Sequence, residues 1–204
     1  MSSPPRFILA TRNAHKTREF ATMLGGGYAI SDLTEVAAEL PLVEETGSTF
    51  EENAILKALA ASRALPGLVV SDDSGLKVAK LGGEPGVRSA RYAGENASDE
   101  ANTARLLAAL DAIGAEGPAR AARFVCVIAL AERGDIIRVF TGAVDGRIAW
   151  APRGQGGFGY DPVFVAEGFE RTFAELGEAE KNTISHRARA IAQLRDYLAS
   201  VSGP

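Results

Sequence analysis

The sequence predicts an α/β protein with a mixed β-sheet flanked by helices. Short apolar, β-branched runs alternate along the 204 residues with segments of helical spacing. Residues 122–146 contain two long apolar runs joined at Arg133, Gly134 and Asp135, a pattern typical of a β-hairpin. Hydrophobic residues make up 46% of the chain and charged residues 24%, values of an ordinary globular protein. The length suits one domain or two closely joined lobes.

The first elements have the order strand, loop, helix, strand. RFILAT at 6–11 is apolar and predicts a strand, and the spacing of Phe20, Met23 and Leu24 predicts a helix that ends in three glycines at 25–27. YAISDL at 28–33 predicts a second strand. This order is typical of the beginning of an α/β protein.

A second helix and a third strand follow. Two overlapping capping boxes predict the helix start, Ser48 with Glu51 and Thr49 with Glu52. We expect this helix to end near Leu65, before Pro66 and Gly67. LVVSDDSG at 68–75 predicts a strand followed by an acidic turn, and residues 76–94 predict a further strand and a long irregular loop.

The remaining elements have clear start signals. Ser98 is expected to cap a helix that runs to about Ile113, and AEGPA at 115–119 is expected to be a linker. After the hairpin and a glycine-rich loop, a last helix is expected from about Ser185 to about Ser200.

Composition excludes several classes of function. The net charge of −4 gives no global electrostatic case for a nucleic-acid polymer as partner. The only cysteine, Cys126, lies in the apolar run FVCVIAL, so we expect a buried thiol and no disulfide framework, which is compatible with a reducing cytoplasm. The sequence shows neither a secretory signal nor an apolar run long enough to span a membrane.

The glycine-rich stretch GQGGFGYDP at 154–162 fits the G-x-G-x-x-G spacing of dinucleotide-binding proteins. That motif requires a strand before the glycines and a helix after them. Here APRGQ precedes them as a loop, Pro162 disfavours a helix, and PVFV follows as a short strand. The sequence therefore argues against a dehydrogenase and leaves a flexible loop that carries Phe158 and Asp161.

Two polar clusters lie near predicted helix starts in the first third of the chain. Residues 11–16, TRNAHK, place unpaired backbone N–H groups and Lys16 where an anion could bind; alternatively, Asn13 simply caps the helix and Lys16 is solvated. Glu44 and Glu45 precede a helix that carries Lys57, and these charged residues could carry chemistry together. Alternatively, the two glutamates only interact favourably with the helix dipole.

Two further clusters could carry chemistry. Asp72 and Asp73 follow a buried strand, where carboxylates suit Mg²⁺, although the same residues fit a tight turn. His186 and Arg187 are expected in the first turn of the last helix, where a cation opposes the helix dipole; such local conflicts are expected at functional sites. P-loop, G-x-S-x-G and H-E-x-x-H motifs are absent from the sequence.

Six blocks of the chain, taken in order, resemble the inosine triphosphate pyrophosphatase family. They are ATRNAHK, EETGSTFEENAILKA, SDDSGL, LGGEPGVRSARYAG, GGFGYDPVF and EKNTISHRARA. The resemblance extends from Phe7 to about Leu198. It implies a single two-lobed domain over residues 1–204 with a long central mixed sheet and a substrate cleft between the lobes. It also implies a cytoplasmic homodimer that hydrolyses ITP, dITP and XTP to the monophosphate and pyrophosphate with Mg²⁺.

The resemblance also implies roles for particular residues. Asp73 is implied as the proton acceptor, and Asp73 with Glu45 or Glu44 as the metal ligands. The substrate-binding residues implied are Thr11, Arg12, Asn13, Ala14, His15, Lys16, Lys57, Ser74, Phe158, Gly159, Tyr160, Asp161, Lys181, His186 and Arg187. Arg12 stands where many members of the family have glycine.

Other functions remain open from the sequence. The chain could be a pyrophosphatase for other modified nucleotides, which a substrate panel would separate. It could also be a purine nucleotide-binding or sensing protein without catalysis, although binding alone does not require paired acidic residues.

Overall fold

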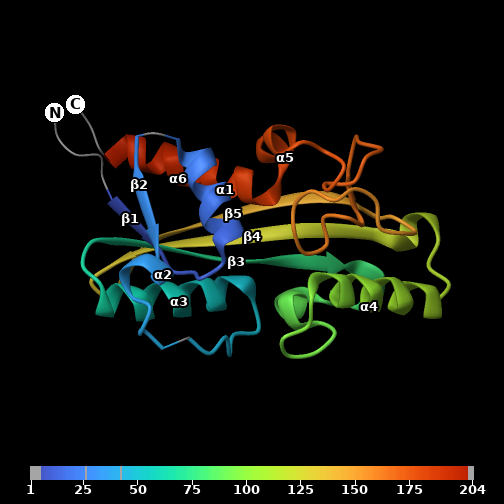
Figure 1. Ribbon diagram of the computed structural model, residues 1–204, viewed down its shortest axis with the longest axis horizontal. Helices are drawn as coiled ribbons and strands as arrows, with labels where there is room; N and C mark the ends of the chain where they lie inside the picture. The colour runs from blue at the N-terminus through green and yellow to red at the C-terminus, as the bar shows by residue number, and fades with distance from the viewer. Residues whose placement is uncertain (1–5, 26, 42, 202–204) are drawn as a thin grey trace. The chain divides into compact units, whose positions relative to one another are not determined.

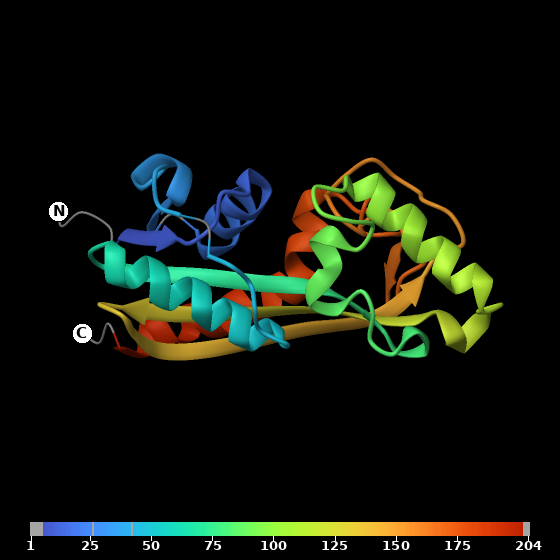
Figure 2. The same ribbon diagram turned by 90° about the horizontal axis from the view of Figure 1, so that it is seen from below.

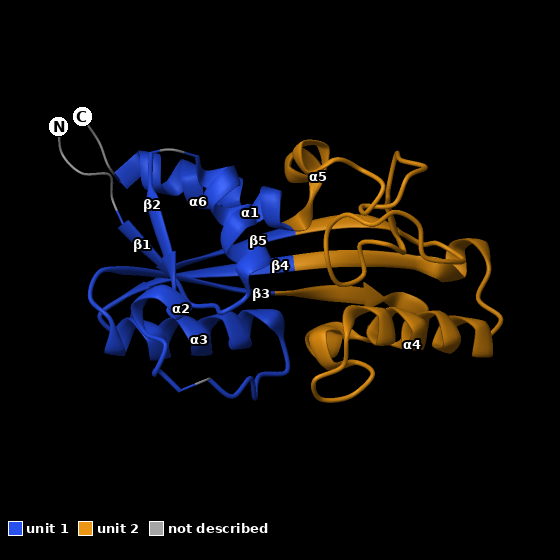
Figure 3. Cartoon of the chain, viewed as in Figure 1, with its two compact units in different colours: residues 1–73, 126–142, 187–204 blue, residues 74–125, 143–186 orange. Residues whose placement is uncertain are grey.

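The computed structural model describes residues 6–25, 27–41 and 43–201, and its chain divides into two compact units. Unit 1 comprises residues 1–73, 126–142 and 187–204, and unit 2 comprises residues 74–125 and 143–186 (Figure 3). The expected single domain over residues 1–204 and the cleft between its lobes stay predictions.

Among the described residues, six strands form one mixed sheet in the order β2-β1-β3-β4-β5-β6. The strands are β1 (Arg6–Leu9), β2 (Ala29–Asp32), β3 (Leu68–Val78), β4 (Ala121–Glu132), β5 (Asp135–Ile148) and β6 (Phe164–Ala166). β1 pairs in parallel with β2 and β3, whereas β6 pairs antiparallel with β5. The predicted α/β class and the mixed sheet are confirmed.

Six α-helices and three short 3₁₀ segments accompany the sheet in the described part of the chain. The helices are α1 (Ala14–Leu24), α2 (Leu33–Val36), α3 (Phe50–Ala64), α4 (Asp99–Ala112), α5 (Glu178–Ile184) and α6 (His186–Val201). The 3₁₀ segments are Ala79–Leu81, Gly86–Arg91 and Gly117–Arg120. No helix among the described residues is both long and apolar enough to cross a membrane.

In unit 1 the two faces of the sheet bury different sets of side chains because strand residues alternate. Phe7, Leu9 and Val70 pack in one cluster with apolar residues of α1 and α6, and Ile8 and Val69 pack in another cluster with Ala61 of α3. Figure 1 accordingly shows α1 and α6 on one side of the sheet and α3 on the other. In Figure 2 α3 runs along β3, and the Ser71 hydroxyl of β3 donates to the Ala54 carbonyl of α3 at 2.5 Å.

Unit 2 has its own core. It buries Leu76 and Val78 of β3, Leu106 and Leu110 of α4, and Phe164 of β6 in one cluster. Three phenylalanine rings of this core lie together, with the Phe124 and Phe164 centroids 4.6 Å apart and the Phe164 and Phe173 centroids 5.0 Å apart.

Most predicted boundaries agree with the structure. Thr49 and Glu52 form the capping box of α3, Ser98 caps α4, and Arg133 and Gly134 adopt the positive φ angles of a tight hairpin turn, 55° and 86°. Gly25 ends α1, whereas Gly26 and Met1–Pro5 lie outside the described residues.

The acidic turn predicted after residue 70 is wrong. β3 continues without a break through Ser71, Asp72, Asp73 and Ser74 to Val78. Asp and Ser favour turns because their side chains compete for nearby backbone groups, but here both carboxylates are buried and bind cations instead. The linker at 115–119 and the irregular loop at 76–94 both contain 3₁₀ turns, and α5 was not predicted.

Candidate active site

Two adjacent carboxylates of β3 point to opposite faces of the sheet in unit 1. Asp73 lies on the face of α3 and contacts Lys57, whereas Asp72 lies on the face of α1 and α6 and contacts Lys16 and Arg187. The strand alternation that divides the apolar core therefore also divides the charges into two clusters.

The first cluster consists of Lys57, Glu45 and Asp73. Lys57 Nζ lies 2.8 Å from Glu45 Oε1 and 2.9 Å from Asp73 Oδ1, so one ammonium bridges two carboxylates. The Asp73 side chain is 10% exposed, and its Oδ2 atom is buried with no hydrogen-bond partner in the described structure. Glu44 is exposed, so Glu45 supplies the carboxylate at Lys57.

The pKa directions in this cluster follow from its unequal charges. Burial raises the pKa of Asp73, and Glu45 raises it further, while Lys57 opposes both. Burial alone would lower the pKa of Lys57, but Asp73 and Glu45 outweigh it and raise that pKa. Both directions are consistent, because the three side chains carry two negative charges and one positive charge.

This cluster has the donors that a magnesium ion would need. Mg²⁺ binds carboxylate oxygens, commonly one or two from the protein, and completes its shell with water and substrate phosphate. Glu45 and the unsatisfied Oδ2 of Asp73 fit that requirement, and a divalent cation would offset the remaining charge. Within the described residues, no three acidic, His or Cys side chains gather into a closed metal site.

The second cluster consists of Asp72, Lys16, Arg187 and Glu19. Asp72 lies 2.8 Å from Lys16 Nζ and 2.9 Å from Arg187 Nη2, and Arg187 Nη1 lies 2.6 Å from Glu19 Oε2. Burial favours protonation of Asp72, but Lys16 and Arg187 outweigh it and hold the pKa of Asp72 far below its ordinary value. Two anions and two cations thus compensate one another inside unit 1.

The start of α1 lies beside this cluster. Asn13 caps the helix, with Oδ1 accepting from the backbone N–H groups of His15 at 2.9 Å and Lys16 at 3.3 Å. Asn13, Ala14 and His15 are exposed, so the N-terminus of α1 is open to solvent, whereas Lys16 is only 17% exposed. The cap predicted at Asn13 is confirmed, and the alternative of a solvated Lys16 is wrong.

Two neighbours of that cap have other contacts. Thr11 Oγ1 accepts from the backbone N–H of Asn13 at 3.1 Å. Arg12 donates to the carbonyls of Ala38 and Leu40, so its side chain holds the segment after α2.

In unit 2 the glycine-rich loop is organised around Asp161. Asp161 Oδ2 accepts from the backbone N–H of Phe158 at 2.9 Å and from Lys181 Nζ at 2.6 Å, and both charged side chains are buried. Lys181 Nζ lies 5.1 Å from the centroid of the Phe158 ring. The structure therefore brings together Phe158, Asp161 and Lys181, three of the predicted substrate residues.

Two glycines serve the packing of this loop. A Cβ on Gly157 would lie 2.0 Å from Asp161 Oδ2, and one on Gly154 would lie 2.5 Å from the Ala174 carbonyl carbon. No helix begins within 149–163, all of which are described, so the dinucleotide motif is excluded as expected.

The remaining predicted residues have diverse settings. His186 is buried and stacks on Phe124, with ring centroids 4.6 Å apart. Tyr160 donates to the Ser89 carbonyl at 2.8 Å, and Ser74 is partly buried on β3. Arg187 was predicted to read the base edge; its guanidinium binds Asp72 and Glu19, and the base role stays a prediction.

Sequence reasoning missed Glu19. Its carboxylate is 9% exposed and binds Arg187 from the buried face of α1. The available signal was a charged residue directly before Phe20, within the stripe that faces the core.

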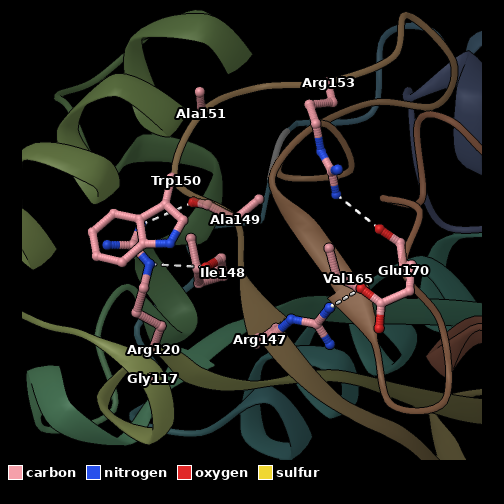
Figure 4. Close-up of a pocket in the computed structure, with 10 residues that line it drawn as sticks. All are labelled: Gly117, Arg120, Arg147, Ile148, Ala149, Trp150, Ala151, Arg153, Val165 and Glu170. Atoms are coloured by element: carbon pink, nitrogen blue, oxygen red, sulfur yellow. Dashed lines mark hydrogen bonds and ion pairs between the residues drawn. The ribbon is translucent and has the colours of Figure 1, made fainter.

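Unit 2 also has a pocket that contains none of the predicted site residues. This pocket of about 490 Å³ is lined by Arg120, Arg147, Arg153, Glu170 and Trp150, among others (Figure 4). The Arg120 guanidinium lies 4.2 Å from the Trp150 ring centroid, and Arg147 pairs with Glu170 at 2.9 Å. Arg120, Arg147 and Arg153 each bind a carbonyl or carboxylate of unit 2. This pocket is therefore separate from the candidate site.

Comparison with known proteins identifies the family. Residues 7–197 match the sequence profile of the Ham1 family. The chain belongs to the Ham1 family. The resemblance to inosine triphosphate pyrophosphatases inferred from six sequence blocks is thereby confirmed.

Relatives match over almost the whole chain. A dITP/XTP pyrophosphatase of Geobacillus kaustophilus is 50% identical, covering 96% of this chain and 95% of the relative. One from Bacillus subtilis is 47% identical, covering 94% and 96%. The structure of a Ham1 protein from Coxiella burnetii has a TM-score of 0.85 at 42% identity, covering 95% of this chain and 98% of that one.

Proposed function

We propose that this Ham1-family protein hydrolyses non-standard purine nucleoside triphosphates, ITP, dITP and XTP, to the nucleoside monophosphate and pyrophosphate. The observation that carries the chemistry is the Lys57 cluster, in which the buried Asp73 and the partly buried Glu45 share one cation and the pKa of Asp73 is raised. Relatives of about half identical sequence are named dITP/XTP pyrophosphatases, which supports the choice of substrate.

Unit 1 would bind the triphosphate. The N-terminus of α1 is exposed to solvent, its helix dipole favours an anion, and Lys16 and Lys57 add positive charge. Glu45 and Asp73 would hold Mg²⁺, which when bound offsets charge on phosphate oxygens and makes a nearby water more acidic. Glu44 would lie outside this shell.

Asp73 would act as the general base. Its carboxylate takes a proton from a water, whose oxygen forms a bond to the α-phosphorus while the bond from that phosphorus to the bridging oxygen breaks. The electron pair leaves with pyrophosphate. An aspartate is a weak base near neutral pH, so the greater acidity that a bound Mg²⁺ would give the water would supply most of the activation.

Unit 2 would bind the base. Phe158 offers an aromatic face, and Lys181 and His186 offer N–H donors to the O6 atom of a 6-keto purine. Adenine carries an amino group at that position, so a donor-lined pocket would leave buried groups unpaired and reject it. Gly159, Tyr160 and Asp161 would either hold this loop in position or contact the base directly.

A substrate panel tests the proposal. Purified protein is incubated with Mg²⁺ and dITP, GTP or ATP, and pyrophosphate and orthophosphate are measured separately. We expect dIMP and pyrophosphate from dITP and little product from the other two. Orthophosphate with dIDP would place the attack at the γ-phosphorus, and no turnover at all would favour a sensing protein.

We also propose that the protein is a homodimer and is located in the cytoplasm, as the family resemblance implies. Light scattering coupled to size-exclusion chromatography tests the first, since a monomer at micromolar concentration would refute it.

A further inference from the structure

Helix α4 carries three polar side chains on one face, of which Asn102 and Thr103 are buried and Asp99 is exposed. Asp99, Asn102 and Thr103 have the spacing i, i+3, i+4, which places them on one face of the helix. Asn102 is 2% and Thr103 4% exposed, although the next buried positions of the helix are Leu106 and Leu110. Buried polar groups in a helix require partners, and these partners lie in two loops.

The first loop is the glycine-rich one, which α4 holds at Gly159. Asp99 Oδ2 accepts from the backbone N–H of Gly159 at 2.6 Å, and Thr103 Oγ1 donates to the Gly159 carbonyl at 3.4 Å. Both backbone polar groups of Gly159 therefore bind α4. The residue has a φ of 62°, which a side chain would disfavour, so this geometry is specific to glycine.

The second loop supports the neighbouring Tyr160. Asn102 accepts from the backbone N–H of Ala93 at 2.8 Å and donates to the Ala90 carbonyl at 3.1 Å. The adjacent Ser89 carbonyl accepts from the Tyr160 hydroxyl at 2.8 Å. One helix face thus fixes two consecutive residues of the glycine-rich loop, one directly and one through residues 89–93.

Close apolar packing does not replace these bonds. A pocket of about 550 Å³ is lined by Thr103, Ala104 and Leu107 of α4 and by loop residues that include Gly156 and Phe158. Gly159 itself has no neighbouring atom within 4 Å of the place where a Cβ would stand, so its position depends on its hydrogen bonds more than on packing.

We propose that Asp99 and Thr103 are positioning residues that hold Gly159 and so orient the ring of Phe158 for the purine. The proposal rests on the proposed function of the Phe158 loop. Phe158 is then fixed from both sides, because its own N–H is bound by Asp161 and the following residue is bound by α4. Neither Asp99 nor Thr103 needs to touch the substrate for this role.

The test compares Asp99→Ala, Asp99→Asn and Glu100→Ala. Asp99→Ala removes a charge-assisted hydrogen bond in a solvent-exposed setting, so we expect the KM for dITP to rise roughly fivefold with kcat within about twofold of wild type. Asp99→Asn keeps an acceptor oxygen and should restore most of the KM. Glu100 is the matched control, since it is an exposed acid in the same helix turn. Thr103→Val should give a smaller rise than Asp99→Ala because its bond is longer.

Hydrogen exchange of the Gly159 amide provides a readout independent of turnover. Exchange should be faster in Asp99→Ala than in wild type and unchanged in Glu100→Ala. If wild type hydrolyses dITP but Asp99→Ala keeps its KM, or Glu100→Ala raises KM equally, the positioning role is refuted and the proposed function stands. If wild type hydrolyses none of the nucleotides, both are refuted.

Discussion

Asp72 and Asp73 are neighbours on β3, yet their environments give them opposite chemistry. Asp72 is buried against Lys16 and Arg187, which hold its pKa far below the ordinary value. Asp73 is buried against Lys57, which also pairs with Glu45, and the pKa of Asp73 is raised. A strand presents alternate residues to alternate faces, so a single strand supplies one charge that is fully compensated and one that is available. A buried charge adjacent to a candidate site is therefore functional or structural according to its partners rather than its position in the sequence.

The largest expected effect is loss of catalysis in Asp73→Asn. The amide cannot accept a proton from water, so kcat for dITP should fall by about a thousandfold, within the range for loss of a general base. Circular dichroism should show an unchanged fold, because Lys57 keeps Glu45. Glu44→Gln is the control, and its kcat should stay within about twofold of wild type. Retained activity in Asp73→Asn would remove Asp73 from the mechanism.

The next effect concerns the stability of Asp72→Asn. Removing one member of a buried ion pair leaves uncompensated charge, so the free energy of unfolding should fall by about 3–5 kcal/mol. Urea denaturation of the metal-free protein measures it. Asp73→Asn should be much less destabilised or more stable than wild type, since it removes the charge that its cluster compensates incompletely. Equal losses in the two variants would contradict the distinction between the clusters.

The pH dependence of stability should separate the same two residues. Asp72, with its pKa below the ordinary 3.8, contributes stability above that pH, which is lost as the pH falls below it. Asp73, with a raised pKa, binds its proton more tightly when folded, so its contribution to stability is present below pH 3.8 and is lost as the pH rises from there through its folded pKa. With EDTA present, Asp73→Asn should thus gain stability relative to wild type as the pH rises above 3.8. A pH-independent difference between them would contradict the raised pKa.

Sequence reasoning placed the strands and helices of this fold better than its charges. The periodicity of apolar residues and the helix caps located β1, α1, α3 and α4 because both signals are local. The residues of β3 from Ser71 to Ser74 resemble a turn, and they form a strand only because partners on α1, α3 and α6 compensate their charges. These partners are distant in the sequence, so the residues around Asp72 and Asp73 do not reveal them.

The same limit applies to single residues of the site. Lys57, Phe158 and Lys181 were recognised through the family blocks, and the structure then supplied their partners. Glu19 and Asp99 have no motif of their own, and each becomes visible only through a contact with a residue 168 or 60 positions away.

A more moderate effect is expected in unit 2 from Phe158→Ala. Stacking of a base on an aromatic ring contributes about 1–3 kcal/mol, so the KM for dITP should rise about tenfold with a smaller change in kcat. Phe158→Tyr keeps the aromatic face and is the control. A KM in Phe158→Ala equal to that of wild type would exclude the stacking role.

The smallest effect is expected at an exposed ion pair of unit 2. Arg123 binds Asp145 through two hydrogen bonds of 2.6 and 2.7 Å, a geometry at least as good as that of Arg187 with Asp72. Both side chains are about half exposed, at 56% and 51%, so water and salt screen the pair. Arg123→Gln should therefore lower the free energy of unfolding by less than about 1 kcal/mol, and added salt should reduce the difference further. Urea denaturation of Arg123→Gln and Asp72→Asn compares two ion pairs of similar geometry and different burial. If both variants lost the same free energy of unfolding, geometry rather than burial would set the stability contribution of ion pairs in this protein.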